Sequence, residues 1–377
     1  MSGSDSQPQT QNGIKHITVL GAGVIGLTTA LKIQQKGGYQ VTVIAQDFPT
    51  DPKTVTYASL SAGAHHVSVA GDDVAQRKID IETFKTMWDL SSPEGDAPGC
   101  FKRLKQKEFH REPTNLDTLS LMPNYTELGK DELVPGAISG ITYDSVNTDA
   151  PIFLNYLLST FLASGGHIVR GSVLHINQVI NGGPGAFAEP DAHVRFPLPD
   201  AVVVCPGLGA RYLGGVEDTD VYPVRGQTVL LNAPWVDFCM SLSGGPGKIW
   251  TYVIPRRSGN VIIGGTYEAD DWHPRPRPET TRDILERVLE ICPEIAPPEI
   301  RAQRKPTVDD ILPIIVEESC GLRPCRKGGV RLESEWLQTS TRRVPVVHNY
   351  GHGGFGYIAC YGSASVALKL LEEALAQ

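Results

Sequence analysis

Three glycines near the start of the chain have the spacing of a loop that binds a dinucleotide. Gly21, Gly23 and Gly26 form the pattern G-x-G-x-x-G, between a short β-branched run and a helical pattern. The first glycine permits a tight turn, the second lets the backbone approach a pyrophosphate, and the third lets helix and strand pack closely. The helix N-terminus adds free N–H groups and a partial positive charge. The pattern predicts a dinucleotide site without separating NAD, NADP and FAD.

Two adjacent residues are candidates for binding the ribose of that dinucleotide. In folds of this kind an acidic side chain near the end of the second strand binds a ribose hydroxyl. Asp47 lies 21 residues after Gly26, which is the expected position, and Gln46 is the other candidate.

A second glycine cluster lies near the C-terminus. Gly351, Gly353, Gly354 and Gly356 stand within six positions, shortly before a helical pattern. Glycines grouped in this way indicate a backbone that approaches another group closely. A small nicotinamide-binding fold does not need a second glycine-rich segment of this kind. The presence of two such segments favours FAD.

The elements around the first loop form a βαβ unit. We predict a strand over 16–20, a helix over 24–35 that ends at Gly37, and a second strand over 39–45. Later patterns predict a helix over 151–164 and strands over 167–170 and 201–205. Short strand-like segments, separated by Pro and Gly, then predict an antiparallel sheet in a second domain. These segments lie at 228–231, 250–254 and 261–264, and helices are expected over 279–291 and 363–376.

Composition excludes several classes of function. The 377 residues favour two domains, and the net charge of −8 without a long basic run argues against nucleic-acid binding. The N-terminus lacks the pattern of a secretory signal, and no stretch of about twenty apolar residues suggests a membrane span. We therefore expect a soluble intracellular protein that has no membrane partner.

The seven cysteines lack the paired short spacing of a zinc site, so no metal is expected. We expect reduced thiols. Cys239 and Cys292 could pair only if the fold brings them together.

The run at 346–356 closely resembles the signature of the D-amino-acid oxidase family, which includes D-aspartate oxidases. Further motifs of that family occur in the same order along the chain. They are found at 19–26, 62–64, 225–228, 252–255, 264–267 and 321–324.

This resemblance implies an α/β fold with two domains. One is a doubly wound FAD-binding domain built from discontinuous segments, and the other is a substrate domain with a large antiparallel sheet. We expect a disordered segment over 1–13. The FAD-binding domain is assigned to 14–75, 150–210 and 308–377, and the substrate-binding domain to 76–149 and 211–307.

The resemblance also implies FAD as the cofactor and a set of contacts to it. The chain departs from the family pattern at Gln46, where some members carry the acidic ribose ligand, and at Pro206, where many have Thr. The implied contacts are Ala22, Gly23, Val24, Ile25, Asp47, Ser59, Gly63, Ala64, Val173, Gly353, Gly354, Gly356, Tyr357 and Ile358.

The implied reaction is oxidative deamination of a D-amino acid, with O2 as the electron acceptor and hydrogen peroxide, ammonia and a 2-oxo acid as products. Arg323 is expected to pair with the substrate carboxylate, because a guanidinium fork matches a carboxylate. Tyr252 is expected to assist it, Tyr267 to shape the pocket, and Gly354 to contact the substrate. The family needs no general base, so none is assigned.

The residue at position 267 bears on substrate preference. D-aspartate oxidases generally resemble one another in having an extra Arg here, because a second substrate carboxylate needs a second cation, whereas this chain has Tyr267. We predict neutral D-amino acids, with D-aspartate oxidase as the alternative. Five residues could instead accept an acidic side chain, although solvated surface is the expectation for each. They are His65, His66, Lys248, Arg256 and Arg257.

Location and assembly are expectations from the family alone. Many members carry a peroxisomal C-terminal tripeptide, whereas this chain ends in Glu373-Ala374-Leu375-Ala376-Gln377. A peroxisomal location is therefore expected by resemblance only, and a homodimer is possible.

Overall fold

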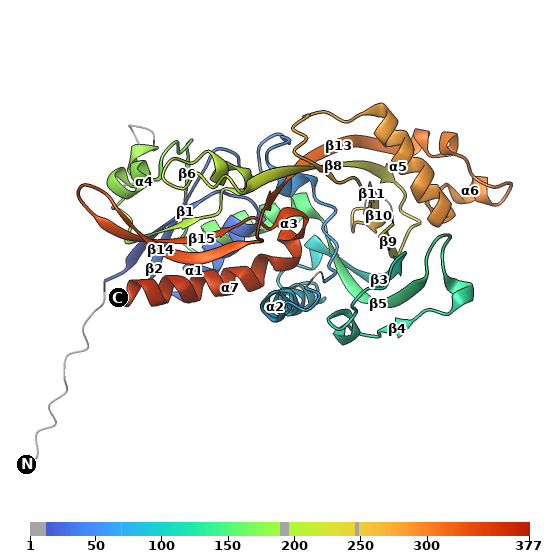
Figure 1. The fold of residues 1–377 in the computed structure, drawn as a ribbon, viewed down its shortest axis with the longest axis horizontal. Coiled ribbons are helices and arrows are strands. Elements are labelled where there is room, and N and C mark those ends of the chain that lie inside the picture. Colours follow the sequence, from blue (N-terminus) through green and yellow to red (C-terminus); the bar gives the residue numbers. More distant parts are fainter. Residues whose placement is uncertain (1–12, 69, 189–195, 246–248) are drawn as a thin grey trace, which may run out of the picture.

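The computed structural model describes residues 13–68, 70–188, 196–245 and 249–377, and it contains two sheets (Figure 1). The first sheet has six strands. The five from β15 through β6 run parallel, and β14 is antiparallel at one edge. Their order across the sheet is β14 (Arg331–Gln338), β15 (Arg343–Tyr350), β7 (Ala201–Val204), β1 (Lys15–Leu20), β2 (Tyr39–Ala45) and β6 (His167–Arg170).

Helices cover both faces of the six-stranded sheet, as a doubly wound fold requires. On one face α1 (Val24–Lys36) packs against α3 (Ala150–Ala163) and α7 (Gly356–Leu375) around a large apolar core. On the other face α4 (Ile176–Gly182) covers a second core. The prediction of a doubly wound α/β fold is confirmed.

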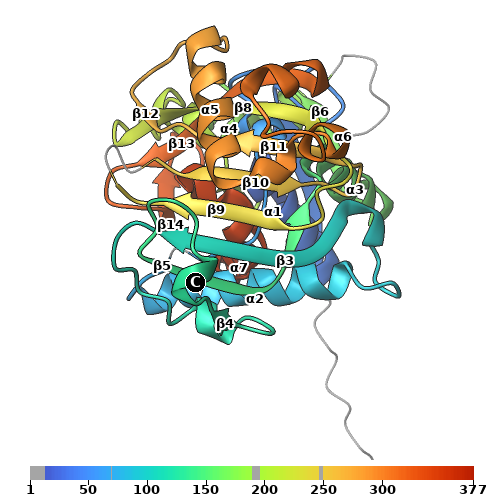
Figure 2. The ribbon, with the colours of Figure 1, turned by 90° about the vertical axis from the view of Figure 1, so that its right-hand side faces the viewer.

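The second sheet has nine strands and lies beside the first in Figure 1, and Figure 2 shows its strands from the front. All neighbours pair antiparallel except β3 and β9. Helix α5 (Pro278–Ile291) buries its apolar side on one face, and α6 (Pro298–Arg301) follows it. The strands are β12 (Glu268–Ala269), β8 (Val221–Asn232), β11 (Asn260–Gly264), β10 (Thr251–Pro255), β9 (Cys239–Ser243), β3 (Phe101–His110), β5 (Ser139–Thr148), β4 (Thr126–Glu127) and β13 (Ile315–Arg326), which pairs with β8.

Most predicted elements are confirmed within one or two residues, but two starts are wrong. The strand predicted over 228–231 is β8, which begins at Val221, and the C-terminal helix also begins earlier than predicted. Helix α7 begins at Gly356 rather than at residue 363. Gly362 lies inside this helix, at a point where α7 packs tightly on α2 (Val74–Leu90). A Cβ on Gly362 would lie 2.4 Å from the carbonyl oxygen of Ile79.

The expected division into domains stays a prediction. Sheet membership places residues 315–326 against β8 rather than in the six-stranded sheet, and α2 packs against α7. The expected disordered segment falls almost wholly on residues 1–12, which lie outside the described residues.

Two further findings concern bonding and hydrophobicity. All seven cysteines are unbonded, so the buried Cys239 and Cys292 do not form a disulfide. In the described part of the chain, no helix is long and apolar enough to cross a membrane.

Candidate active site

The first glycine loop joins β1 to α1 at a place where side chains would not fit. Gly21 has a φ of 101°, and a Cβ there would lie 2.4 Å from the carbonyl oxygen of Cys205. A Cβ on Gly26 would lie 2.0 Å from the carbonyl oxygen of Gly21. Both glycines are therefore required for α1 to begin this close to the strands.

Ser59 lies beside this loop and closes one side of it. The Val24 N–H donates to Ser59 Oγ at 3.0 Å, and a Cβ on Gly23 would lie 3.0 Å from the same oxygen. The Tyr357 hydroxyl donates to the Ser59 carbonyl at 2.9 Å. Ser59 thus connects the start of α1 with the first turn of α7.

The second glycine cluster meets the first loop at the N-terminus of α7. Gly353 has a φ of 58°, and a Cβ on it would lie 2.8 Å from Cys325 Sγ. A Cβ on Gly356 would lie 3.5 Å from Val24 Cγ1. The two glycine regions, more than three hundred residues apart, therefore come together where two helices begin.

Arg323, on β13, lies between two glycines. A Cβ on Gly226 of β8 would lie 2.4 Å from Arg323 Cζ, and a Cβ on Gly354 would lie 3.2 Å from its Cδ. Arg323 Nη1 donates to the Thr266 carbonyl at 2.8 Å. No carboxylate of the described residues pairs with Arg323. A half-buried guanidinium is therefore free to bind a carboxylate from outside the chain.

Tyr252, on β10, is 9% exposed and faces the same region. Burial raises the pKa of its hydroxyl, and the Arg323 guanidinium opposes that rise, which indicates that the two groups are close. The ring packs on the backbone of β11, since a Cβ on Gly264 would lie 2.5 Å from Tyr252 Oη. The structure therefore places Tyr252 and Gly354 next to Arg323, and their role in binding substrate stays a prediction.

Tyr267 directly follows Thr266, whose carbonyl accepts from Arg323, but it is far more exposed than Tyr252. Its side chain is 56% exposed, and its neighbour is Tyr222, whose pKa is raised by burial and by Tyr267. The expectation that Tyr267 shapes the substrate pocket stays a prediction.

The family to which this geometry belongs is shown by comparison with known proteins. The model of the family described as DAO, FAD dependent oxidoreductase, matches residues 16–370. The chain belongs to this DAO family. Its cofactor is FAD.

Relatives of the DAO chain carry two different names. The D-aspartate oxidase of Cryptococcus neoformans var. grubii is 36% identical over 389 residues, which cover 95% of this chain and 97% of that protein. The D-amino-acid oxidase of Schizosaccharomyces pombe is 33% identical over 372 residues, which cover 97% and 99%. Glycine oxidase from Bacillus cereus has a similar fold, with a TM-score of 0.70, 16% identity and coverage of 95% and 97%.

The residues of this DAO chain fit FAD. The N-termini of α1 and α7 come together at glycine-rich backbone. Backbone N–H groups without side chains around them suit a pyrophosphate. Gly63 has no room for a side chain, because a Cβ there would lie 2.6 Å from Ile254 Cδ1. The next residue, Ala64, has a positive φ of 60°. His65 Nε2 is buried without a hydrogen-bond partner among the described residues. Such an atom beside the glycine loops is consistent with a missing polar ligand.

The adenosine end of FAD would lie beyond the carboxyl ends of β2 and β6, which pair in parallel. Asp47 and Val173 follow these two strands. Gln46 is engaged within the protein, since its carbonyl accepts from Arg170 at 2.7 Å and its Oε1 lies 3.5 Å from Ser172 Oγ. Asp47 has no hydrogen-bond partner in the described ranges, and this favours Asp47 as the ribose ligand.

Three of the five residues considered for an acidic substrate, His65, His66 and Arg256, do not supply a free cation. His66 and Arg256 are buried, so the expectation of solvated surface is wrong for both. Burial lowers the pKa of His65 to about 4 and that of His66 to about 3, so both rings are neutral near pH 7.

The two arginines of this set differ, because only Arg256 has a carboxylate partner in the described ranges. Arg256 lies 3.9 Å from Asp149 and donates to the Ala62 carbonyl at 3.2 Å. Arg257 is exposed and donates to the Pro98 carbonyl. Lys248 lies outside the described residues.

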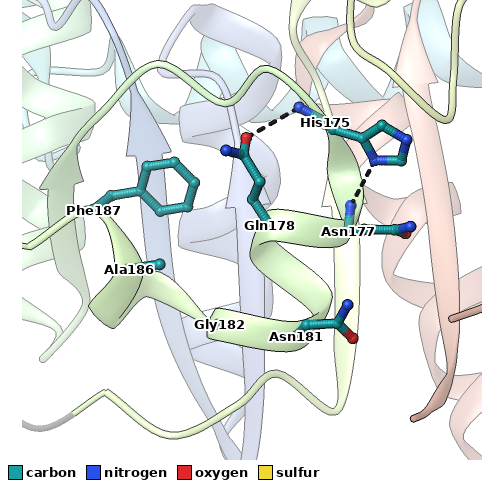
Figure 3. A pocket seen from close by; sticks show the side chains of 7 residues that line it. All are labelled: His175, Asn177, Gln178, Asn181, Gly182, Ala186 and Phe187. Atoms are coloured by element: carbon teal, nitrogen blue, oxygen red, sulfur yellow. Dashed lines mark hydrogen bonds between the residues drawn. The ribbon is translucent and has the colours of Figure 1, made fainter. Parts of the chain in front are cut away.

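A separate surface hollow lies over α4 (Figure 3). His175 caps this helix, because the Asn177 N–H donates to its Nδ1 at 3.1 Å. The hollow contains none of the predicted site residues. Its lining consists of His175, Asn177, Gln178, Asn181, Gly182, Ala186 and Phe187.

Sequence reasoning missed Gly226 and Gly264 as parts of the site. Both lie in motifs that carry the family resemblance, and an isolated glycine within a strand pattern often marks a close approach of another group. Here the approaching groups are the side chains of Arg323 and Tyr252.

Proposed function

We propose that this chain is a D-amino-acid oxidase that prefers neutral substrates. The observation that carries the proposal is Arg323, a guanidinium without a carboxylate partner in the described ranges, packed between Gly226 and Gly354 and facing the buried Tyr252. One fixed cation suits the one carboxylate that every α-amino acid carries.

Each group at the site has a proposed role in holding the substrate. Arg323 binds both carboxylate oxygens, and the Tyr252 hydroxyl donates a hydrogen bond to one of them. Gly354 lets the substrate Cα approach the start of α7 without meeting a side chain. These contacts orient the Cα–H bond and leave the amine free to lose its proton to solvent.

Bound FAD supplies the redox chemistry, because it accepts the hydride equivalent that leaves Cα. The substrate loses two electrons and becomes an imino acid, which water converts to a 2-oxo acid and ammonia. O2 takes up the two electrons and becomes hydrogen peroxide.

The preference for neutral substrates is supported by the engaged or neutral state of three other candidate residues. His65 and His66 are neutral, and Arg256 is paired with Asp149. Tyr267 also stands where a second arginine would be expected. A second carboxylate in the substrate therefore finds no free cation among these residues.

The alternative is a D-aspartate oxidase. It is favoured by one observation, the 36% identity to a protein named D-aspartate oxidase, which exceeds the 33% identity to a D-amino-acid oxidase. Identities this close do not separate two activities on one fold.

The reaction itself is tested by peroxide release. The purified yellow protein should produce hydrogen peroxide with D-alanine and none with L-alanine. Equal release from both enantiomers, or release from neither, would contradict the proposal.

The family resemblance also supports a homodimer inside the peroxisome. Light scattering after size-exclusion chromatography tests the dimer, and imaging of a tagged chain in cells tests the location. A monomeric mass would contradict the homodimer, and a diffuse signal would contradict the peroxisomal location.

A further inference from the structure

A row of side chains crosses the nine-stranded sheet from Tyr252 to Glu108. Tyr252 of β10 pairs with Ser241 of β9, and Ser241 pairs with Glu108 of β3. Figure 2 shows these three strands side by side. Directly paired residues project to the same face of a sheet, and two strand spacings amount to about 10 Å. Glu108 therefore lies on the face that carries Tyr252, within reach of a bound substrate's side chain.

Glu108 is an unusual residue for the middle of a sheet. It is 4% exposed and accepts a hydrogen bond from the Tyr143 hydroxyl, and no Lys, Arg or His in the described ranges forms an ion pair with it. Burial raises the pKa of this carboxyl to about 7. A buried carboxyl without a cation is costly, so its retention suggests a role other than stability.

Buried polar atoms without hydrogen-bond partners among the described residues occur on β3, on β5 and in the segment that bridges to β5. They include Gln106 Oε1, Asn147 Oδ1 and His65 Nε2. Asn147 donates its Nδ2 to the Pro255 carbonyl at 2.9 Å, so its oxygen is the free atom. The His65 ring is 6.3 Å from the Tyr252 ring and its backbone bridges to Asn147. Most buried polar atoms have hydrogen-bond partners, so several buried polar atoms without one point to a ligand from outside the chain.

The chemistry of these atoms describes the ligand. Gln106 lies two residues from Glu108 on the same face of β3, its side-chain oxygen is an acceptor, and Glu108 has acceptor capacity beyond its bond to Tyr143. A site lined by hydrogen-bond acceptors favours a substrate side chain that carries N–H donors and disfavours one that ends in a carboxylate. A carboxamide has two such donors, and in D-glutamine its nitrogen lies roughly 5 Å from Cα.

We propose that Glu108 and Gln106 form a side-chain subsite that selects a D-amino acid with a terminal carboxamide over the corresponding acid. The inference rests on the proposed function, and it names Glu108 as the residue that discriminates between D-glutamine and D-glutamate. These two substrates have the same shape, so their comparison isolates the terminal group.

The first test is the ratio of kcat/KM for D-glutamine to that for D-glutamate in Glu108→Gln. At about pH 8, where a carboxyl with a pKa of about 7 is mostly ionised, the ratio should fall about tenfold, because the variant replaces one acceptor oxygen with a donor and removes the charge that repels D-glutamate. The matched control is Glu290→Gln, an exposed glutamate on α5, which should keep the wild-type ratio. An unchanged ratio in Glu108→Gln would overturn the subsite.

The second test uses only the wild-type holoenzyme, in case the variant does not fold. Glutaramate and glutarate are the two substrates without their amino groups, and each should perturb the flavin absorbance on binding. Glutaramate should bind about tenfold more tightly. Equal or tighter binding of glutarate would overturn the subsite. If no D-amino acid reduces the flavin at all, the proposed function fails instead.

Discussion

The guanidinium of Arg323 lies directly over the backbone of Gly226, where a Cβ would come within 2.4 Å of Arg323 Cζ. These two residues belong to neighbouring strands, and Arg323 pairs with Val224 on β8. The glycine creates the space in which the arginine lies flat. This packing sets the direction from which a carboxylate can approach.

Gly226→Ala should displace Arg323 and weaken the substrate site while FAD still binds. A shift of about 1 Å in a positioning group can lower kcat/KM roughly a hundredfold. Steady-state kinetics with D-alanine measure the loss, and flavin absorbance reports retained cofactor. Wild-type kinetics in this variant would show that the packing on Gly226 is unimportant.

Arg323→Lys should also lower kcat/KM for D-alanine about a hundredfold. The charge is kept, but a lysine ammonium lacks the planar fork that binds both carboxylate oxygens. The loss should appear mainly as a higher KM, with unchanged flavin absorbance. A KM equal to that of the wild type would exclude Arg323 as the carboxylate ligand.

Gly26→Ala should abolish FAD binding, because the new Cβ would lie 2.0 Å from backbone that cannot move independently. The purified variant should be colourless and should unfold at a lower temperature. Gly99→Ala is the matched control, since no atom lies within 4 Å of the position of its Cβ. Retained flavin in Gly26→Ala would contradict the predicted role of the loop.

Stability should fall as the pH drops from about 6.5 to about 4. Burial holds the pKa of His65 and of His352 at about 4 and that of His66 at about 3. The unfolded chain binds protons on these rings below about 6.5 while the folded chain does not, so protonation favours unfolding. Glu108, whose pKa is raised to about 7, acts in the opposite direction over part of this range.

Urea unfolding at pH 7.0, 5.5 and 4.5 checks this dependence. In His352→Asn, whose side chain is uncharged, the decline should be shallower than in the wild type. A decline of equal steepness in both proteins would rule out His352 as a contributor.

Sequence reasoning reached those parts of the site that depend on local pattern. Gly21, Gly23 and Gly26 act within one turn, and their conformational demands are visible in their spacing. Arg323 and Tyr252 came from the family resemblance rather than from any pattern of their own. Their proximity depends on the pairing of β13 with β8 and of β10 with β11.

The features that were missed depend on sheet register and tertiary packing. Glu108 lies in a charged stretch of β3 that resembles a surface strand, and only the pairing with Ser241 places it in line with Tyr252. Similarly, burial of His66 and Arg256 follows from the packing of distant segments. A shift of one residue in a strand would reverse each of these assignments.

The most direct test of the proposed function is anaerobic mixing of the yellow holoenzyme with D-alanine and, separately, with D-aspartate. Loss of flavin absorbance reports reduction in each case. We predict rapid bleaching by D-alanine and slower bleaching by D-aspartate. Faster bleaching by D-aspartate would contradict the neutral preference, and absence of bleaching by both would contradict the proposed oxidase activity itself.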